Sequence, residues 1–166
     1  RSPACETVET PGTGWCVPRL SGGSEMTTTT RLRVRDLMTE GVYAVNVNDD
    51  LATVSDLMDA RNIRHAPVVG AGGELVGLIS QRDLLRYALK DQPGVPPAVE
   101  RTVQSSVTAG EIMTAEVATA RPDQDIREAA QILLVNKFGC LPVVDDGRLV
   151  GILTEADFVR FLAEGD

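Results

Sequence analysis

Hydrophobic positions in residues 42–61 follow first the period of a strand and then the period of a helix. Residues Val42 to Val47 alternate between apolar and polar side chains and predict a short strand. Asp49 or Asp50 can cap a helix after this strand. The apolar residues of that helix fall on one face, namely Leu51, Val54, Leu57 and Met58.

Two apolar runs and a second amphipathic segment complete the pattern. Ala66–Val69 and Leu75–Ile79 flank the glycine-rich turn Gly70–Gly73 and predict a hairpin. Ser80 opens a helix that continues through Leu89. The predicted order is therefore strand, helix, strand, strand, helix.

The same pattern occurs twice in the chain. Three segments, Asp36–Thr39, Ala66–Val69 and Gly77–Asp83, correspond in order to Glu111–Thr114, Leu141–Val144 and Gly151–Asp157. Pro67 and Pro142 are 75 residues apart, whereas Asp83 and Asp157 are 74 apart, because the second hairpin turn is shorter by one residue. Two copies are too few for an open solenoid, so we expect them to pack against each other and to form clefts where they meet.

Composition and charge limit the possible functions. The chain has 166 residues, of which 43% are hydrophobic and 24% charged, as in globular proteins. Its net charge of −8 disfavours binding to nucleic acid or to an anionic membrane. The sequence contains neither an apolar run of about 18 residues nor a signal peptide, so we expect a cytoplasmic protein without membrane association. A single histidine and three scattered cysteines predict no metal site and no disulfide framework.

The first 30 residues lack apolar periodicity. We expect residues 1–30 to be a leader that is disordered or was added during cloning, with Met26 as the natural start. A flexible extension cut from a longer precursor is the alternative.

The repeated element order, together with its x-Pro-Val-Val and Gly-apolar-apolar-(Ser/Thr)-x-x-Asp segments, closely resembles the cystathionine β-synthase (CBS) domain. A pair of such domains is called a Bateman module, and the resemblance extends from Val34 to about Phe161. It implies an α/β (α+β) fold in which two domains of β-α-β-β-α order pack sheet to sheet around a pseudo-twofold axis. We assign residues 31–90 to the first domain, 91–107 to a linker with a short helix over Val99–Val107, and 108–166 to the second domain.

The resemblance also implies clefts that bind adenine nucleotides or related adenosyl ligands. Ser80-x-x-Asp83 and Thr154-x-x-Asp157 each begin a helix, where free amides favour a phosphate and the aspartate can accept hydrogen bonds from ribose hydroxyls. The same spacing is also that of a capping box, which needs no ligand.

Residues around the proline strands extend the candidate site. The backbone before each proline can meet an adenine edge, and apolar residues of the preceding strand can line the base, although these residues are equally suited to an ordinary core. The candidate binding residues of the first copy are Val42, Ala44, Arg64, His65, Ala66, Pro67, Ser80, Arg82 and Asp83. Those of the second copy are Val117, Thr119, Cys140, Leu141, Pro142, Thr154 and Asp157.

The two copies differ in charge at this site. In the second copy, the counterparts of Arg64, His65 and Arg82 are Gly139, Cys140 and Ala156. We therefore hypothesise that one cleft prefers a charged nucleotide, while the other is empty or takes a less charged adenosyl group. The alternative is that the arginines are ordinary solvated surface groups.

Catalysis is not expected from these residues. His65 and Cys140 are the only pair that resembles a base and a nucleophile, but no orienting group or oxyanion-hole motif accompanies them. We expect no catalytic cofactor.

The sequence therefore predicts a regulatory sensor of AMP, ADP or ATP that acts through the geometry of a homodimer or through a separate effector protein. Leu85 and Phe161, on the last helix of each copy, are the expected dimer contacts. The leading alternative is a protein-interaction module of the same fold without a small-molecule ligand. Nucleic-acid binding by this scaffold is a further alternative that the acidic charge disfavours.

Overall fold

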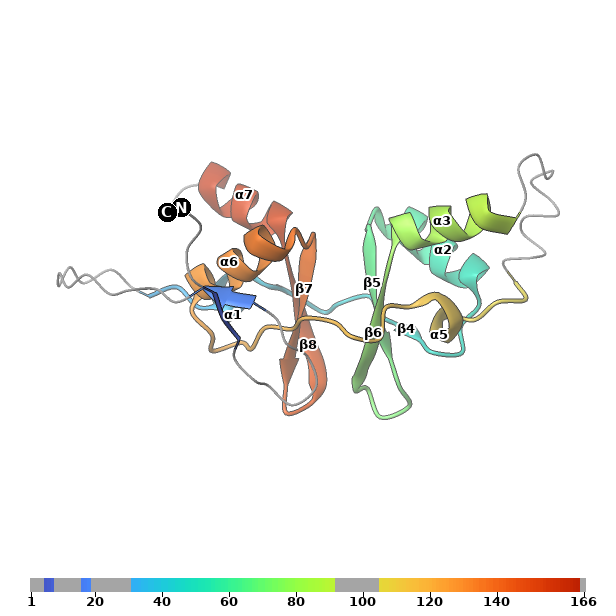
Figure 1. Cartoon of the computed structure of the whole chain (residues 1–166), viewed down its shortest axis with the longest axis horizontal. Helices are drawn as coiled ribbons and strands as arrows, with labels where there is room; N and C mark the ends of the chain where they lie inside the picture. Colours follow the sequence, from blue (N-terminus) through green and yellow to red (C-terminus); the bar gives the residue numbers. More distant parts are fainter. Residues whose placement is uncertain (1–4, 8–15, 19–30, 92–104, 165–166) are drawn as a thin grey trace. The chain divides into compact units, whose positions relative to one another are not determined.

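The computed structural model describes residues 5–7, 16–18, 31–91 and 105–164, and these form two compact units (Figure 1). The unit built mainly from the first copy comprises Val42–Val117 and Asp146–Leu149 and is called the first-copy unit below. The second-copy unit comprises Arg1–Gly41, Ala118–Asp145 and Val150–Asp166. Each unit combines helices with a small sheet, so the α+β class is confirmed.

The first-copy unit has the predicted order of elements. They are β4 (Val45–Asn46), α2 (Leu51–Arg61), β5 (His65–Val69), β6 (Leu75–Ser80), α3 (Gln81–Asp91) and α5 (Ala109–Ile112). In the sheet, β5 lies between β4, which is parallel to it, and β6, which is antiparallel. Helices α2 and α3 lie on the same side of this sheet (Figure 1). Buried side chains from the sheet and helices form its core, including Val54, Met58, Val68 and Ile79.

Strand β4 is shorter than the predicted strand over Val42–Val47. The carboxylate of Asp49 accepts a hydrogen bond from the Asn46 amide at 2.7 Å, which turns the chain toward the helix. Of the two candidate caps, Asp50 is the one that caps α2, because its carboxylate accepts from the Thr53 amide at 2.7 Å.

The second-copy unit repeats this arrangement. Its elements are α1 (Val34–Leu37), β3 (Thr39–Glu40), α6 (Ile126–Asn136), β7 (Cys140–Asp145), β8 (Arg148–Thr154) and α7 (Glu155–Glu164), with β8 between β3 and β7. Its core contains buried residues from all three chain segments of the unit, including Val34, Leu133, Leu141 and Leu153.

The strand predicted over Val117–Ala120 is reduced to one bridge. Ala120 pairs in parallel with Val143, donating to the Pro142 carbonyl at 3.0 Å and accepting from the Val144 amide at 2.9 Å. The next amide that would extend this ladder belongs to Pro122, which has no N–H group. At the corresponding position of the first copy, Val47 donates to the Val69 carbonyl at 3.2 Å.

The opening segment of each copy lies in the other copy's unit. Strand β3 pairs with β8, with Thr39 opposite Ile152. In the first-copy unit, Thr114 and Leu78 exchange two backbone hydrogen bonds of 2.9 and 3.0 Å. The compact units therefore differ from the sequence ranges 31–90 and 108–166, and sheet-to-sheet packing remains a prediction.

Two parts of the chain depart from or fall outside the expectations. Within the leader, β1 (Cys5–Thr7) and β2 (Cys16–Pro18) pair antiparallel, which differs from the absence of structure expected for residues 1–30; the rest of the leader lies outside the described residues. Most of the helix expected over Val99–Val107 also lies outside them, and residues 105–107 are not helical. No helix in the described part of the chain is long and apolar enough to cross a membrane.

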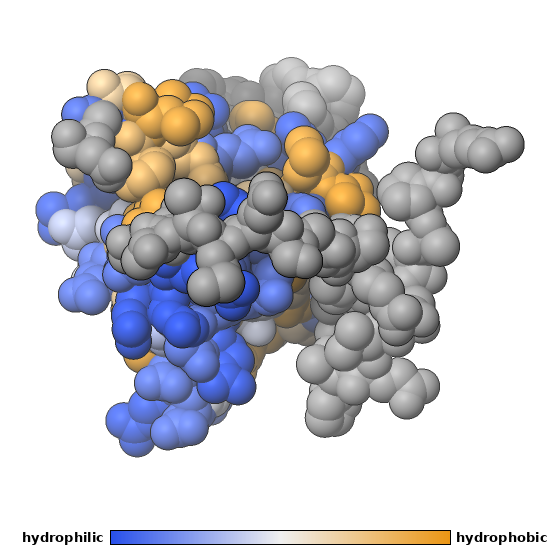
Figure 2. Space-filling view, turned by 90° about the vertical axis from the view of Figure 1, so that its left-hand side faces the viewer, coloured by the Kyte–Doolittle hydropathy of each residue, from blue (hydrophilic) through white to orange (hydrophobic). Residues whose placement is uncertain are grey.

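Helices α6 and α7 of the second-copy unit carry large apolar side chains on their outer surface. Leu134 and Leu162 are 78% and 80% exposed, and Val135, Val159 and Phe161 are also exposed. We call these five residues the α6–α7 face. Figure 2 views the side on which α6 and α7 are drawn in Figure 1, and hydrophobic residues gather in its upper part.

A glycine in each sheet allows the opening segment to approach closely. A Cβ atom on Gly77 would lie 2.5 Å from Met113 Sδ and 3.0 Å from the Thr114 carbonyl oxygen. On Gly151, it would lie 2.6 Å from Met38 Sδ and 3.3 Å from the Thr39 carbonyl oxygen. The recurring glycine and methionine therefore fit together within each unit.

We expect Gly77→Ala to lower the free energy of unfolding by about 1–3 kcal/mol, because the added methyl group would displace Met113 and the Thr114 backbone. Urea titration followed by circular dichroism measures this change. Gly72→Ala is the control, because its Cβ would meet only the flexible end of Glu74. A Gly77→Ala protein as stable as the Gly72→Ala protein would contradict the close approach.

Candidate functional site

The candidate residues of the first copy converge at one end of its sheet. Val45 of β4 lies opposite Val68 in a parallel pairing, so the chain just before β4 approaches the start of β5, and the antiparallel β6 ends beside that start. His65, the first residue of β5, is opposite Ser80, the last residue of β6. Val42 and Ala44 come just before β4, and α3 begins directly after Ser80. All nine residues therefore belong to one compact unit, and this end is called the first-copy site.

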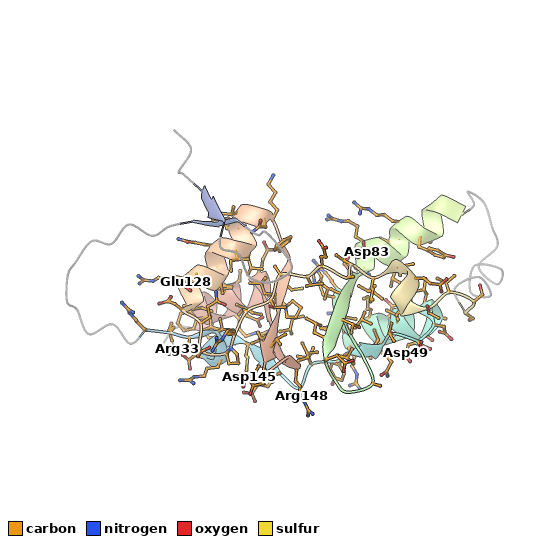
Figure 3. All side chains as sticks on the ribbon, turned by 60° about the horizontal axis from the view of Figure 1, so that its bottom comes forward. Arg33, Asp49, Asp83, Glu128, Asp145 and Arg148 are labelled. Carbon is orange, nitrogen blue, oxygen red and sulfur yellow. The ribbon has the colours of Figure 1, made fainter. Side chains whose placement is uncertain are left out.

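Asp83 closes the start of α3, as Figure 3 shows. Its Oδ2 atom accepts hydrogen bonds from the Ser80 amide at 2.9 Å and from Ser80 Oγ at 2.5 Å. The Asp83 amide donates to Ser80 Oγ at 3.3 Å. The capping box left open by the sequence is therefore formed, and it uses only one of the two carboxylate oxygens.

The surroundings of Asp83 combine an apolar base with exposed cations. Ala66 and Pro67 are buried, and the Ala66 side chain belongs to the core, so its backbone rather than its side chain is available to a ligand. Arg64 and Arg82 are exposed. The Arg64 carbonyl accepts from the Gln81 amide at 2.9 Å, which holds β5 against the helix start.

The second-copy site has the same backbone plan. The Glu155 amide donates to the Gly139 carbonyl at 3.3 Å, as Gln81 does to Arg64. The buried residues Cys140, Leu141 and Pro142 begin β7, and Thr119 is exposed. Val117 lies in the first-copy unit, so the structure does not group it with the other six residues of this site.

Asp157 is held more tightly than Asp83. Its Oδ2 atom accepts from the Thr154 amide and from Thr154 Oγ1, each at 2.7 Å. Its Oδ1 atom accepts from Thr39 Oγ1 at 3.4 Å and from Arg160 Nη1 at 3.3 Å. Asp157 is only 5% exposed, whereas Asp83 is partly exposed.

Comparison with known families agrees with this architecture. A family model described as the CBS domain matches residues 34–90 and 109–164, which together make up more than half of the chain. The chain belongs to the CBS domain family. The two matches make it a tandem CBS pair.

Relatives of this CBS pair include proteins of different lengths. The uncharacterized protein MJ1225 of Methanocaldococcus jannaschii is 32% identical over 129 residues, which cover 78% of this chain and 42% of that protein. The CBS pair spans less than half the length of the first curated relatives it matches.

Two similar solved structures contain adenosyl ligands. The CBS pair is 28% identical to CBSX2, solved in complex with AMP, with a TM-score of 0.67 over 80% of this chain and 96% of that chain. It is 29% identical to the CBS domain pair of protein MJ0100, solved in complex with 5-methylthioadenosine and S-adenosyl-L-methionine. That TM-score is 0.65, and the match covers 80% of this chain and 97% of the other.

Thr39 was missed as a site residue by the sequence analysis, and Arg160 was not among its candidate binding residues. Thr39 reaches Asp157 because β3 pairs with β8, a pairing between distant parts of the chain. Arg160 lies three residues after Asp157, and Arg86 lies three residues after Asp83, so the sequence offered a shared Asp-x-x-Arg signal. That signal did not distinguish the copies.

The Cys140 thiol is unsuited to nucleophilic catalysis. It is 4% exposed, and burial raises its pKa from 9.0 to about 12, so it stays protonated at neutral pH. Within the described residues, no group of three or more His, Cys, Asp or Glu side chains is arranged to hold a metal ion.

We expect Cys140 to make the protein less stable in alkali. A thiol pKa of 9.0 in the unfolded chain and about 12 in the folded chain means that its stabilising effect is complete below pH 9.0 and is lost as the pH rises toward 12. The unfolding free energy of the unsubstituted protein minus that of Cys140→Ala should fall as the pH rises through this window. The decrease should be at most about 1.4 kcal/mol per pH unit. A flat difference between pH 9 and pH 11 would contradict the raised pKa.

Proposed function

We propose that this CBS pair is a regulatory module that binds an adenine nucleotide, AMP, ADP or ATP, at its first-copy site. The observation that carries the proposal is Asp83, a partly exposed carboxylate at the start of an 11-residue helix with one oxygen outside the capping box. Vicinal ribose hydroxyls are donors that such an oxygen can accept. The cap and the ligand contact are compatible because they use different oxygens.

Charge near Asp83 favours a ligand with phosphate. The start of α3 carries the positive end of the helix dipole, which favours an anion. Arg64 and Arg82 add exposed guanidinium groups in the same unit, and their counterparts Gly139 and Ala156 carry no charge. The first-copy site is therefore better suited to a phosphorylated nucleotide than the second-copy site.

Similar proteins support an adenosyl ligand in general rather than one nucleotide. AMP is bound in CBSX2, and methylthioadenosine and S-adenosylmethionine in MJ0100. These three ligands share adenine and ribose and differ in charge. We favour AMP, ADP or ATP here because Arg64 and Arg82 are exposed cations of the same unit.

We further propose that the output of the module is self-association through the α6–α7 face. The counterparts of Leu134, Val135 and Leu162 on the first copy are Asp59, Ala60 and Ala88. The counterpart of Val159 is the exposed Leu85, so the apolar surface is larger on the second-copy unit without being confined to it. Such a face is characteristic of an interaction site. The same two helices expose Arg127 and Arg160 along with Glu128, Glu155 and Glu164.

This mixture of charges favours a second copy of the chain as the occupant. A twofold contact brings identical faces together, so each arginine can meet a glutamate of the other copy. Elsewhere, two copies with a net charge of −8 each would repel one another. Phe161, one of the two expected dimer contacts, lies on this face, and Leu85 lies on α3.

Ligand binding is tested by thermal unfolding with AMP, ADP, ATP, S-adenosylmethionine and methylthioadenosine. A ligand at about 100 times its dissociation constant should stabilise the protein by about 2.7 kcal/mol, which raises the melting temperature by several degrees. Asp83→Ala should abolish the increase caused by AMP.

The control is Asp50→Ala, because it removes another aspartate cap in the same unit, the one on α2, and should keep the response to AMP. If no compound changes the melting temperature, the interaction module without a small ligand becomes the better account.

Self-association is tested by a double substitution of the α6–α7 face. Val159→Glu with Leu162→Glu should convert a dimer to a monomer in sedimentation equilibrium, because four carboxylates would meet at the twofold contact. Both side chains are mostly exposed, so the stability of the unit should change by no more than about 0.5 kcal/mol per site. Tyr43→Ser, at an exposed aromatic of the other unit, should leave the dimer intact. An unchanged dimer in the double variant would exclude this face.

A further inference from the structure

The two equivalent aspartates differ in how many of their acceptor positions are occupied. A carboxylate offers about four lone-pair positions. Asp157 receives two donors on Oδ2, both from Thr154, and two on Oδ1, from Thr39 and Arg160. Its capacity to accept further hydrogen bonds is therefore used up within the protein.

Asp83 retains acceptor capacity, although the same residue types surround it in the sequence. Both of its accepted bonds come from Ser80 and end on Oδ2. Thr114 and Arg86 are the counterparts of Thr39 and Arg160, but among the described residues neither of them bonds to Asp83. The difference between the copies therefore lies in contacts and not in residue types.

Arg160 covers the Asp157 carboxylate from the solvent side. The arginine side chain is 60% exposed, whereas the carboxylate beneath it is 4% exposed. The exposed arginine can swing out into water, and the cost of this opening comes mainly from leaving the buried Asp157 carboxylate without that partner. Thr39 approaches the same oxygen at 3.4 Å, a long and weak hydrogen bond.

We propose that Arg160 and Thr39 form a latch that competes with a ribose for Asp157 and so keeps the second-copy site closed. The proposal rests on the proposed function, because it assumes that the equivalent carboxylate of the first copy receives the ribose. An adenosyl ligand reaches Asp157 only in the fraction of molecules whose latch is open. The apparent dissociation constant is the intrinsic one divided by that fraction, so a latch open in about one molecule in ten weakens binding about tenfold.

The latch gives the two sites different roles. The first-copy site responds at low ligand concentration, because no described residue bonds to the Oδ1 atom of Asp83 and has to be displaced. The second-copy site responds at a higher concentration and releases Arg160 when it does. Arg160 lies on α7, which also carries three residues of the α6–α7 face, so opening the latch frees a cation at that surface.

The test removes the latch in a protein in which only the second-copy site is intact. Methylthioadenosine is the probe because it has the ribose hydroxyls and no phosphate, so loss of the arginine charge does not weaken it directly. Isothermal titration of Asp83→Ala and of Asp83→Ala with Arg160→Ala compares the closed and open states. We expect the double variant to bind at least about tenfold more tightly. Arg160→Gln is a second variant that removes the positive charge and keeps more of the side chain than Arg160→Ala does.

The matched control is Arg86→Ala in the same Asp83→Ala background, because Arg86 is the counterpart of Arg160 and, among the described residues, makes no bond to Asp83. It should leave the dissociation constant unchanged. Equal affinities with and without Arg160, including no binding in either protein, would overturn the latch. So would an equal gain from Arg86→Ala, which would reflect net charge alone.

Failure of the proposed function has a separate signature. In that case, the natural chain shows no thermal shift with AMP or the other nucleotides. If the natural chain responds to AMP and the Arg160 variants bind methylthioadenosine no better than their parent, only the latch is rejected.

Discussion

Both sheets depend on the close approach of a methionine-threonine segment to a glycine of a strand that lies far away in the sequence. Gly77 leaves room for Met113, and Gly151 leaves room for Met38. Backbone hydrogen bonds of Thr114 to Leu78, and of β3 to β8, follow from this contact. Each unit is thereby completed by a segment of the other repeat, so neither repeat forms its unit alone. The same contact brings Thr39 to Asp157 and thus contributes to the chemistry of the second-copy site.

One short motif caps the same helix start in both copies, and the proposed function gives it a second role in binding. In both copies a hydroxyl residue and an aspartate satisfy the amide at the end of a glycine-bearing strand. The cap occupies Oδ2 and leaves the role of Oδ1 to the surroundings. With Asp83 this oxygen has no partner among the described residues, whereas with Asp157 it is bonded twice. In the proposed function, the structural cap binds a ligand only where the rest of the unit leaves an oxygen available.

The asymmetry of the CBS pair extends from the sites to the surface. The first-copy unit combines the available carboxylate with Arg64 and Arg82, while the second-copy unit combines the occupied carboxylate with an exposed apolar face. The proposed function therefore assigns the charged ligand to the first copy and the contact with a partner to the second. This division is consistent with a regulatory module, in which a binding event at one place changes association at another.

The sequence by itself determined the element order, its repetition, the hairpins and the hydroxyl-aspartate caps, because these follow from local periodicity and from turn and cap chemistry. The candidate residues of the first copy lie in one unit because β4 and β6 pair on either side of β5, and their role in binding stays a prediction. Tertiary structure decided what local patterns do not encode. Pro122 ends one ladder that Val47 continues in the other copy, and Cys140 is buried rather than reactive. Asp-x-x-Arg occurs in both copies, yet only Arg160 bonds to its aspartate among the described residues, because burial and long-range packing differ around two identical spacings.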